Sequence, residues 1–542
     1  MTLSTIATNK AADHAPPLPG HFLPAPYALA FWLILVAVAL LGVANCALLP
    51  PFEEYDSIQY WSGIQQVADT GAIPVLGQAR ISVDVDNYTG PRTFDQKPGR
   101  FFNGRLYRDF FAQGGVLPEP ATRHYQPGQE GNYEGQQPPL YFVALAPAYL
   151  LARDWAWPSH MLFLRLVSWS LAFIGFAAGT IASVRVLSDL RMAPSLALLL
   201  PAWPLLFPEF FADMARLGNN GLSLCFAGIA WAFTLRLLRQ PGWLAAVGLG
   251  VALGLGLLTK AFFIPIALGV GLLFLYQAFR LRSFRPILPV VIALAVAGLV
   301  GGGWYLHNWL TTGSFTNLAD YGPLEQQGGM LRSILAQGVG SHEVEHFLRG
   351  MAVMAATFVW AGSWSRAILW PVLAAPILLM AAIAFSTWIV QWRRWSLAGQ
   401  VPLFFVAPFA AGLVYHQLVW VFSSAPDMAG TPGWHLHVVA PALALAFALG
   451  WRYRRLLGLL AAYAIVFHAA CWASQASFFS GCAYPPAPRE SLQLGPGSCL
   501  IDVGHLAALG EPLLAGLALL LGISAAGAAL FFARRAQAVQ AA

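Results

Sequence analysis

Long apolar runs separated by short polar connections dominate the chain from residue 27 onward. An α-helix needs roughly 17 to 25 mostly apolar residues to cross the hydrocarbon core of a bilayer. Twelve spans are predicted on this basis, at 27–49, 161–185, 193–212, 221–238, 243–260, 261–279, 286–306, 368–391, 400–423, 435–451, 455–474 and 512–533. The pattern therefore predicts an all-α polytopic membrane protein with about twelve transmembrane helices.

Two further apolar stretches, 138–152 and 350–362, are short for a span. We interpret both as re-entrant or interfacial helices on the outer face of the membrane. A third helix is predicted directly after the first span, where Tyr60, Trp61, Ile64 and Val67 fall mostly on one face. This juxtamembrane amphipathic helix is expected to begin at Asp56, a candidate N-cap, and to end at Gly71, a candidate C-cap.

Short arginine-rich connections indicate the orientation, because cytoplasmic loops carry an excess of Lys and Arg. With twelve spans, all six such connections fall on one side together with both termini; they lie at 185–191, 236–240, 280–285, 391–395, 452–455 and 533–535. Counting either short apolar stretch alone as a span would break this agreement. The pattern predicts both termini in the cytoplasm and the outer loops on the opposite side of the membrane. The preference for arginine over lysine and the frequent alanines indicate a GC-rich bacterial genome, so the membrane is expected to be the bacterial cytoplasmic (inner) membrane, with the outer loops facing the periplasm or exterior.

The loops suggest a division into three parts. Residues 1–26 form a cytoplasmic tail, residues 27–320 a transmembrane module with a large outer loop at 51–137, and residues 321–542 a second outer loop and the C-terminal helices, with a last outer loop at 475–511. Cys482 and Cys499 share that last loop, where a disulfide between them is plausible outside the cytoplasm.

Composition agrees with a membrane class. Hydrophobic residues make up 58% of the 542 residues and charged residues only 10%, whereas soluble domains carry roughly 25% charged residues. The net charge of +6 does not indicate nucleic acid, because only three of the 30 cations are lysine and most arginines cluster at the ends of spans.

Polar groups gather on the predicted outer face. Three carboxylates, Glu53, Glu54 and Asp56, follow the first span within four positions. The other candidate residues at this face are Tyr133, Glu134, Gln136, Gln137, Asp213, Arg216, Asn219, Asn220, Lys260, Trp304, His307, Asn308, His435 and His437. Acids, amides, aromatics and a few cations in one interfacial plane suit a reaction between a lipid-linked substrate and a polar acceptor.

The chemistry expected of these groups follows from their position. A carboxylate at the lipid–water boundary is partly desolvated, which raises its proton affinity and lets it take a proton from a hydroxyl or amine. Lys260 could hold a lipid phosphate that leaves, and an ionisable residue in a membrane segment is a functional candidate by default. Each group also has a plainer interpretation: the acids as a solvated helix start, Lys260 as a snorkelling side chain, and the tryptophans as interfacial belt residues.

One motif points to different chemistry. The segment HEVEH (342–346) satisfies the H-E-x-x-H pattern of zinc proteases, which places His342 and His346 on one face of a helix. Ser341 could cap that helix. No third ligand stands at a known spacing, so the alternative is the polar start of the second interfacial helix.

Several segments, in order along the first 320 residues, resemble the GT-C superfamily of multi-pass glycosyltransferases, which use polyprenyl-phosphate sugars. Members include the protein O-mannosyltransferases and the lipid A aminoarabinose transferase, and the likeness is greatest to an uncharacterised bacterial multi-pass family grouped with them. The resembling segments are PPFEEYDSIQYW (50–61), YEGQQPPLYF (133–142), FLRLVSWSLAFIG (163–175), GLLTKAFF (256–263) and GGGWYLHNWLTTGSF (301–315), with weaker likeness in TFVWAGSW and GTPGWHLHVVAP. Ser57, Tyr60 and His307 depart from the residues usual in that family, where Glu, His and Arg stand.

This resemblance implies a GT-C-like fold and an inverting sugar transfer on the outer face, from a polyprenyl-phosphate donor to a cell-envelope glycan, lipid or protein. Asp56 would be the base, with Glu53, Glu54 or Glu134 orienting the acceptor. Lys260, with His307, would contact the donor phosphate, and Tyr133 and Trp304 would stack on sugar rings. The use of a divalent cation stays open. A transporter or flippase of lipid-linked sugars and a zinc metalloprotease at HEVEH are the alternatives.

Overall fold

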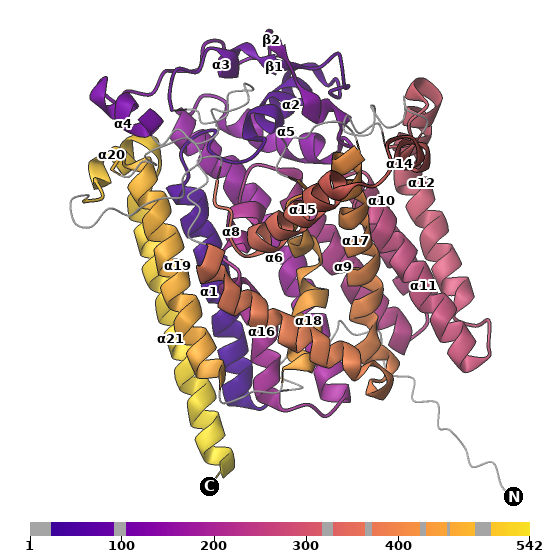
Figure 1. Cartoon of the computed structure of the whole chain (residues 1–542). Coiled ribbons are helices and arrows are strands. Elements are labelled where there is room, and N and C mark those ends of the chain that lie inside the picture. The colour runs from indigo at the N-terminus through magenta and orange to yellow at the C-terminus, as the bar shows by residue number, and fades with distance from the viewer. Residues whose placement is uncertain are drawn as a thin grey trace, which may run out of the picture.

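Helices make up most of the computed structural model, which describes residues 23–91, 105–316, 329–363, 371–422, 430–451, 456–482 and 500–541. Ten helical segments in these ranges are long and apolar enough to cross a membrane. They comprise α1 (Ala25–Leu48), α6 (Trp157–Asp189), α9 (Asn219–Arg239), α11 (Phe263–Leu281), α12 (Ile287–Thr312), α16 (Pro371–Val390), α17 (Leu397–Phe422), η6 with α18 (Gly433–Val439 and Ala440–Gly450), α19 (Leu457–Phe479) and α21 (Pro512–Ala541). Most run along one common direction (Figure 1), and the predicted all-α polytopic membrane architecture is confirmed.

Two of the twelve predicted spans correspond to shorter apolar helices. The segment 243–260 forms α10 (Trp243–Leu257) and leaves the helix before Lys260. The segment 193–212 is divided into η3 (Pro194–Leu198), α7 (Leu199–Leu206) and α8 (Glu209–Met214). Pro208 explains the break between α7 and α8, because a proline disfavours helical backbone at the preceding residue. Phe207 is accordingly extended, with φ −127° and ψ 90°.

The arginine-rich connections come together at one end of the bundle. Arg239, at the end of α9, pairs with Asp189 at the end of α6, with 2.9 Å between Nε and Oδ2. Arg280, at the end of α11, donates to the side chain of Gln400 (3.3 Å), whose amide donates to the carbonyl of Trp392 in η5 (Trp392–Arg394). The connection 452–455 and most of the predicted tail lie outside the described residues.

Helix α21 lies antiparallel to α1, so the start of α1 and the end of α21 share the arginine end (Figure 1). The backbone N–H of Glu511 donates to the carbonyl of Ala47 near the end of α1 (2.9 Å). Further along α21, Gly522 packs against Ala37 and Leu41 in the middle of α1. The antiparallel pairing agrees with termini on one side of the membrane.

Glycines let pairs of helices approach closely. A Cβ atom on Gly228 of α9 would lie 1.9 Å from the carbonyl oxygen of Gly175 in α6. A Cβ atom on Gly250 of α10 would lie 2.5 Å from the carbonyl of Ala293 in α12. Small residues at such contacts are typical of membrane helix packing, since lipid gives little hydrophobic drive for association.

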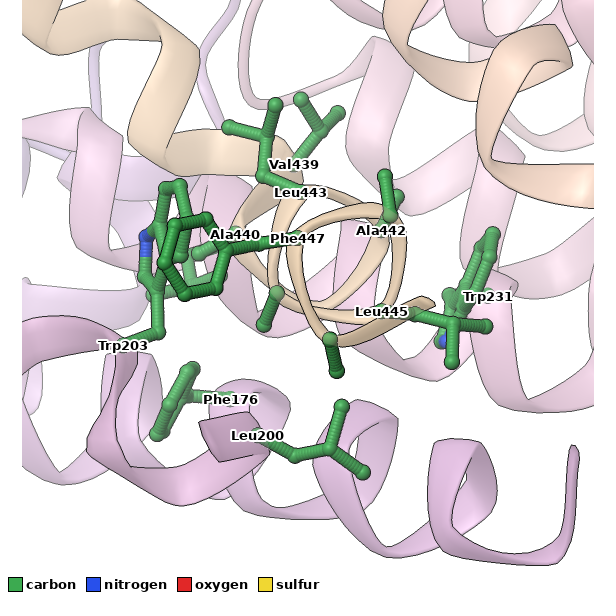
Figure 2. Close-up of a cluster of buried hydrophobic side chains, with 14 of the residues drawn as sticks. Phe176, Leu200, Trp203, Trp231, Val439, Ala440, Ala442, Leu443, Leu445 and Phe447 are labelled. Carbon is green, nitrogen blue, oxygen red and sulfur yellow. The ribbon is translucent and has the colours of Figure 1, made fainter. Parts of the chain in front are cut away.

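Helix α18 forms the centre of the apolar core, and all of its residues are buried. Figure 2 shows Leu445 directed toward Trp231 of α9, and Phe447 beside Trp203 of α7, with 5.9 Å between the ring centroids. Because no side of α18 is polar, the helix is stable only inside a bundle or in lipid.

Opposite the arginine end, the predicted first outer loop folds as a layer over the bundle (Figure 1). It contains α2 (Ser57–Thr70), α3 (Val83–Asp86), α4 (Arg105–Ala112), η2 (Tyr133–Gln136) and an antiparallel pair of strands, β1 (Arg80–Ser82) and β2 (Pro127–Gly131), in which Arg80 pairs with Gly131. The predicted short stretches appear as α5 (Leu140–Ala152) and as the end of α15 (Ser341–Val359), and α14 (Met330–Gln337) and α20 (Val503–Leu509) complete this end.

The predicted amphipathic helix is α2, and it ends at Gly71 (φ 68°) as expected. Asp56 occupies the N-cap position as expected, but its side chain makes no capping hydrogen bond. The helix is also covered on almost every side, with Ser57 to Gln65 buried, because α5 and β1 pack on it. Cys482 carries a disulfide; Cys499, its expected partner, lies outside the described residues.

Candidate functional site

A buried arginine builds the turn that leads from α1 to α2. Arg165 of α6 donates to the carbonyls of Leu49 (2.5 Å) and Pro50 (2.6 Å), and its Nε forms an ion pair with the carboxylate of Glu54. Both charged side chains are only 1% exposed. The guanidinium thus satisfies carbonyls that the end of a helix leaves without partners, and it fixes where the chain leaves the bundle.

The same turn holds Asp56 in a left-handed conformation. Phe52 (φ 59°) and Asp56 (φ 62°) both have positive φ values, which Asp tolerates far better than a bulky residue does. The Asp56 carboxylate accepts a hydrogen bond from the hydroxyl of Tyr133 in η2. Unlike the other carboxylates of this region, Asp56 is only half-buried.

Glu134 lies next to Asp56 in a buried position. Burial, together with the negative charge of Asp56, raises the pKa of Glu134 from 4.5 to about 8. The nearby hydroxyl of Tyr60 in α2 partly offsets this rise of the pKa, and Oε2 of Glu134 has no hydrogen-bond partner. Burial thus favours the protonated form of this carboxyl group, which can itself donate a hydrogen bond.

Two cations face these acids from the bundle. Lys260, in the connection between α10 and α11, donates to Oδ1 of Asn220 (2.8 Å) and lies 4.4 Å from the ring centroid of Phe262. Burial lowers the pKa of Lys260 to about 8, against the raising effect of Glu134. Arg216 pairs with Asp213 (2.9 Å) and donates to the carbonyl of Tyr55 (3.0 Å), immediately before Asp56.

Amides at the start of α9 join these groups to the rest of the site. The Asn220 amide donates to Asp213 (2.8 Å) and lies 3.3 Å from Nδ1 of His435 in η6. The Asn219 amide donates to Oε1 of Gln137 (3.2 Å). We call the set Asp56, Tyr60, Tyr133, Glu134, Gln137, Asp213, Arg216, Asn219, Asn220, Lys260 and His435 the polar cluster.

The polar cluster lies at the end of the bundle opposite the arginine connections. Helix α9 begins at Asn219 in the cluster and ends at Arg239, and α11 begins just after Lys260 and ends beside Arg280. The cluster therefore sits at one face of the predicted membrane and not at its middle.

Two of the predicted acids make other contacts. Glu54 is paired with Arg165, as described above. Glu53 is fully buried; its Oε2 accepts from the hydroxyl of Tyr107 in α4 (2.5 Å) and its Oε1 from the hydroxyl of Ser363 after α15 (2.6 Å). Both acids thus tie distant segments to the end of α1.

The three predicted residues at the end of α12 stand apart from the polar cluster. His307 is exposed, Trp304 is half-buried and Asn308 is buried with its Nδ2 atom unpartnered. Within the described ranges, no hydrogen bond or ion pair joins these side chains to the polar cluster. Sequence position at a span end was not sufficient to bring them into it.

The HEVEH segment begins α15. The rings of His342 and His346 are 4.3 Å apart, but Glu343 accepts from the backbone N–H of Gly340 (2.8 Å) and so caps the helix. Gly340, not Ser341, occupies the N-cap position. Across the part of the chain that the structure describes, no group of three His, Cys, Asp or Glu residues is arranged to hold a metal ion.

Two functional candidates were missed in the sequence, Arg165 as an organiser of the turn and Glu209. Glu209, at the start of α8, is fully buried and accepts from the backbone N–H groups of Ala361 (2.6 Å) and Gly362 (2.9 Å). Both are single charges inside otherwise apolar runs. That signal could have identified them, since charges in membrane segments are costly and paired.

The comparisons with known proteins give structural likeness only. No protein-family model and no curated protein matches the chain. ArnT from Cupriavidus metallidurans in the apo state is similar at 14% identity and a TM-score of 0.41, over 80% of this chain and 70% of ArnT. ArnT bound to undecaprenyl phosphate is similar at 14% identity and a TM-score of 0.45, over 92% of this chain and 75% of ArnT.

The oligosaccharyltransferase of Archaeoglobus fulgidus, tethered to an acceptor peptide, is similar at 13% identity and a TM-score of 0.36, over 85% of this chain and 64% of that one. These proteins belong to the GT-C superfamily that the sequence motifs resemble. At TM-scores below 0.5 the likenesses assign no residue role and no substrate to this chain.

Proposed function

We propose that the chain is a membrane glycosyltransferase that transfers a sugar from a polyprenyl-phosphate donor to an extracytoplasmic acceptor. The observation that carries the proposal is that a half-buried carboxylate, Asp56, lies within electrostatic reach of two cations, Lys260 and Arg216, at one membrane face. A base and a positively charged phosphate site side by side are what such a transfer needs.

Asp56 is the base in this proposal because it is the carboxylate of the polar cluster that a substrate can reach. Glu134 and Asp213 are buried at 4% and 2% exposure. An acceptor hydroxyl or amine loses its proton to Asp56 as it attacks the anomeric carbon of the donor sugar. The bond from that carbon to the phosphate oxygen breaks, and the anionic lipid phosphate leaves toward Lys260. Arg216, which is buried and paired with Asp213, adds its positive charge at longer range.

The remaining groups position the reactants. The Tyr133 hydroxyl fixes the rotamer of Asp56, and Glu134, whose protonated form is favoured by burial, can donate to a substrate oxygen. Asn220 holds Lys260 by its side-chain oxygen, and Gln137 with Asn219 links η2 to α9. Because His307, Trp304 and Asn308 stand apart from the polar cluster, no step is assigned to them.

The test is transfer of labelled sugar from undecaprenyl-phosphate sugars in membranes that contain the purified and reconstituted protein. Asp56→Asn keeps the size and the tolerance of a left-handed backbone, and we expect it to lose about 10²- to 10⁴-fold in rate. Asp109→Asn, on the exposed face of α4, is the matched control and should transfer normally. Full activity of Asp56→Asn with normal insertion would remove the base from the proposal.

The same experiment separates the alternatives. A flippase would move the lipid-linked sugar across the vesicle membrane without forming a glycosidic product. Transporters place their polar groups near the bilayer midplane, whereas the polar cluster lies at one end of the bundle. A metalloprotease would respond to His342→Ala and would carry bound zinc.

A further inference from the structure

A cavity at the arginine end of the bundle is unconnected with the polar cluster. It has a volume of about 430 Å³ and lies between the end of α9, the end of α11 and the start of α12. Its walls are mostly apolar, and the residues that line it are Leu237, Pro241, Phe274, Gln277, Leu281, Ser283, Arg285, Pro286 and Pro289. Ligand pockets typically have volumes of about 300 to 1,000 Å³.

The rim of the cavity carries uncompensated positive charge. Arg285 lines it, and Arg282 stands in the same turn with a left-handed backbone (φ 48°) that ends α11. Both side chains are exposed, and in the described part of the chain neither has a carboxylate within 4.0 Å. The Oε1 atom of Gln277, a lining residue, is buried without a hydrogen-bond partner.

Apolar side chains surround the same turn. Phe279, Leu281 and Phe284 are 82%, 61% and 88% exposed. Side chains of this size at the end of membrane helices lie in the acyl region or at the interface of the bilayer. The cavity therefore opens where lipid tails and head groups are both within reach.

We propose that this cavity binds one anionic phospholipid from the leaflet at the arginine end. An acyl chain lies against Leu237, Phe274 and Leu281, and the head-group phosphate accepts from Arg285 and Arg282. Ser283 and Gln277 supply neutral polar contacts at the level of the glycerol ester groups. Basic pockets between helices on the cytoplasmic side are the sites where anionic lipid head groups bind.

Native mass spectrometry of the detergent-solubilised protein tests the proposal with phosphatidylglycerol and phosphatidylcholine of equal chain length as probes. We expect the wild type to retain one phosphatidylglycerol about tenfold more strongly than phosphatidylcholine. Each arginine near an anionic head group adds electrostatic binding free energy, which the electrically neutral head group of phosphatidylcholine does not gain. Arg282→Gln with Arg285→Gln should abolish this preference.

Arg534→Gln with Arg535→Gln is the matched control, because it removes the same charge at the same end of the molecule from exposed positions of α21. Ser283→Trp, which fills the cavity and leaves all arginines in place, should reduce retention of the anionic lipid as well. Equal retention of the two lipids by the wild type, or equal loss in the control pair and the Arg282/Arg285 pair, would overturn the proposal. So would unchanged retention in Ser283→Trp.

Discussion

Removing the guanidinium of Arg165 is expected to destabilise the protein by about 3 to 5 kcal/mol, because it leaves the Glu54 carboxylate buried without its counter-charge. Both side chains are 1% exposed, so solvent screening does not reduce this cost. The carbonyl of Leu49 also loses its donor, and an unsatisfied buried acceptor costs about 1 to 3 kcal/mol. The carbonyl of Pro50 keeps the backbone N–H of Glu53 as a donor (3.4 Å). The estimate of 3 to 5 kcal/mol is therefore at the lower end of what the contacts imply.

A double-mutant cycle separates the ion pair from the packing. Arg165→Met keeps the length of the side chain, and Glu54→Gln keeps its shape while removing its charge. We expect the double variant to be more stable than the sum of the single changes predicts, with a coupling energy of about 1 to 3 kcal/mol. The free energy of unfolding can be measured by denaturant titration in mixed micelles, followed by the fluorescence of the 20 tryptophans.

The pair also positions Asp56, two residues beyond Glu54. In the sugar-transfer assay, Arg165→Met should lower kcat more than it raises KM, because the base moves while the cations of the polar cluster keep their partners. A cost below about 1 kcal/mol for Arg165→Met, or additive single changes, would refute the argument that this ion pair builds the turn. Asp109→Asn provides the control for removing an acidic charge outside the turn.

Three other outcomes are expected. Because burial raises the pKa of Glu134 to about 8, the wild type should lose stability relative to Glu134→Gln as the pH rises from about 5 to 8, by up to about 1.4 kcal/mol per pH unit. Lys260, with a pKa lowered to about 8, is protonated in both the folded and the unfolded state over most of this range. Melting temperatures of the two proteins that run parallel with pH would contradict the expectation. Gly228→Ala places a Cβ atom 1.9 Å from the Gly175 carbonyl oxygen and should lower the free energy of unfolding by about 1 to 3 kcal/mol. Gly298→Ala, with nothing within 4 Å of its added Cβ, should lower it much less. Equal thermal midpoints of the two variants would show that α6 and α9 separate freely. His342→Ala, on the exposed start of α15, should change stability by less than about 0.5 kcal/mol. If zinc raises the melting temperature of the wild type and His342→Ala abolishes this rise, the metal-site interpretation of HEVEH is restored.

The sequence by itself determined the elements and the ends of the bundle. A membrane helix must satisfy its own backbone hydrogen bonds and present apolar side chains to lipid, so its length and position follow from the local run of residues. The arginine connections at 185–191, 236–240 and 280–285 likewise came together as the charge pattern predicted. Where the chain departs from a predicted span, at 193–212, the cause is Pro208, whose effect on the preceding residue does not show in the apolar pattern.

Only the tertiary structure decided which polar groups act together. Glu53, Glu54 and Asp56 lie within four positions, yet one bonds to Tyr107 and Ser363, one to Arg165 and one to Tyr133. The partners are 54 to 310 residues away in the chain. The left-handed backbone at Asp56, which orients its side chain, is not visible in the apolar and polar pattern of the sequence. Local periodicity reports which face of an element is apolar, but the pairing of buried charges depends on which distant helix supplies the counter-charge.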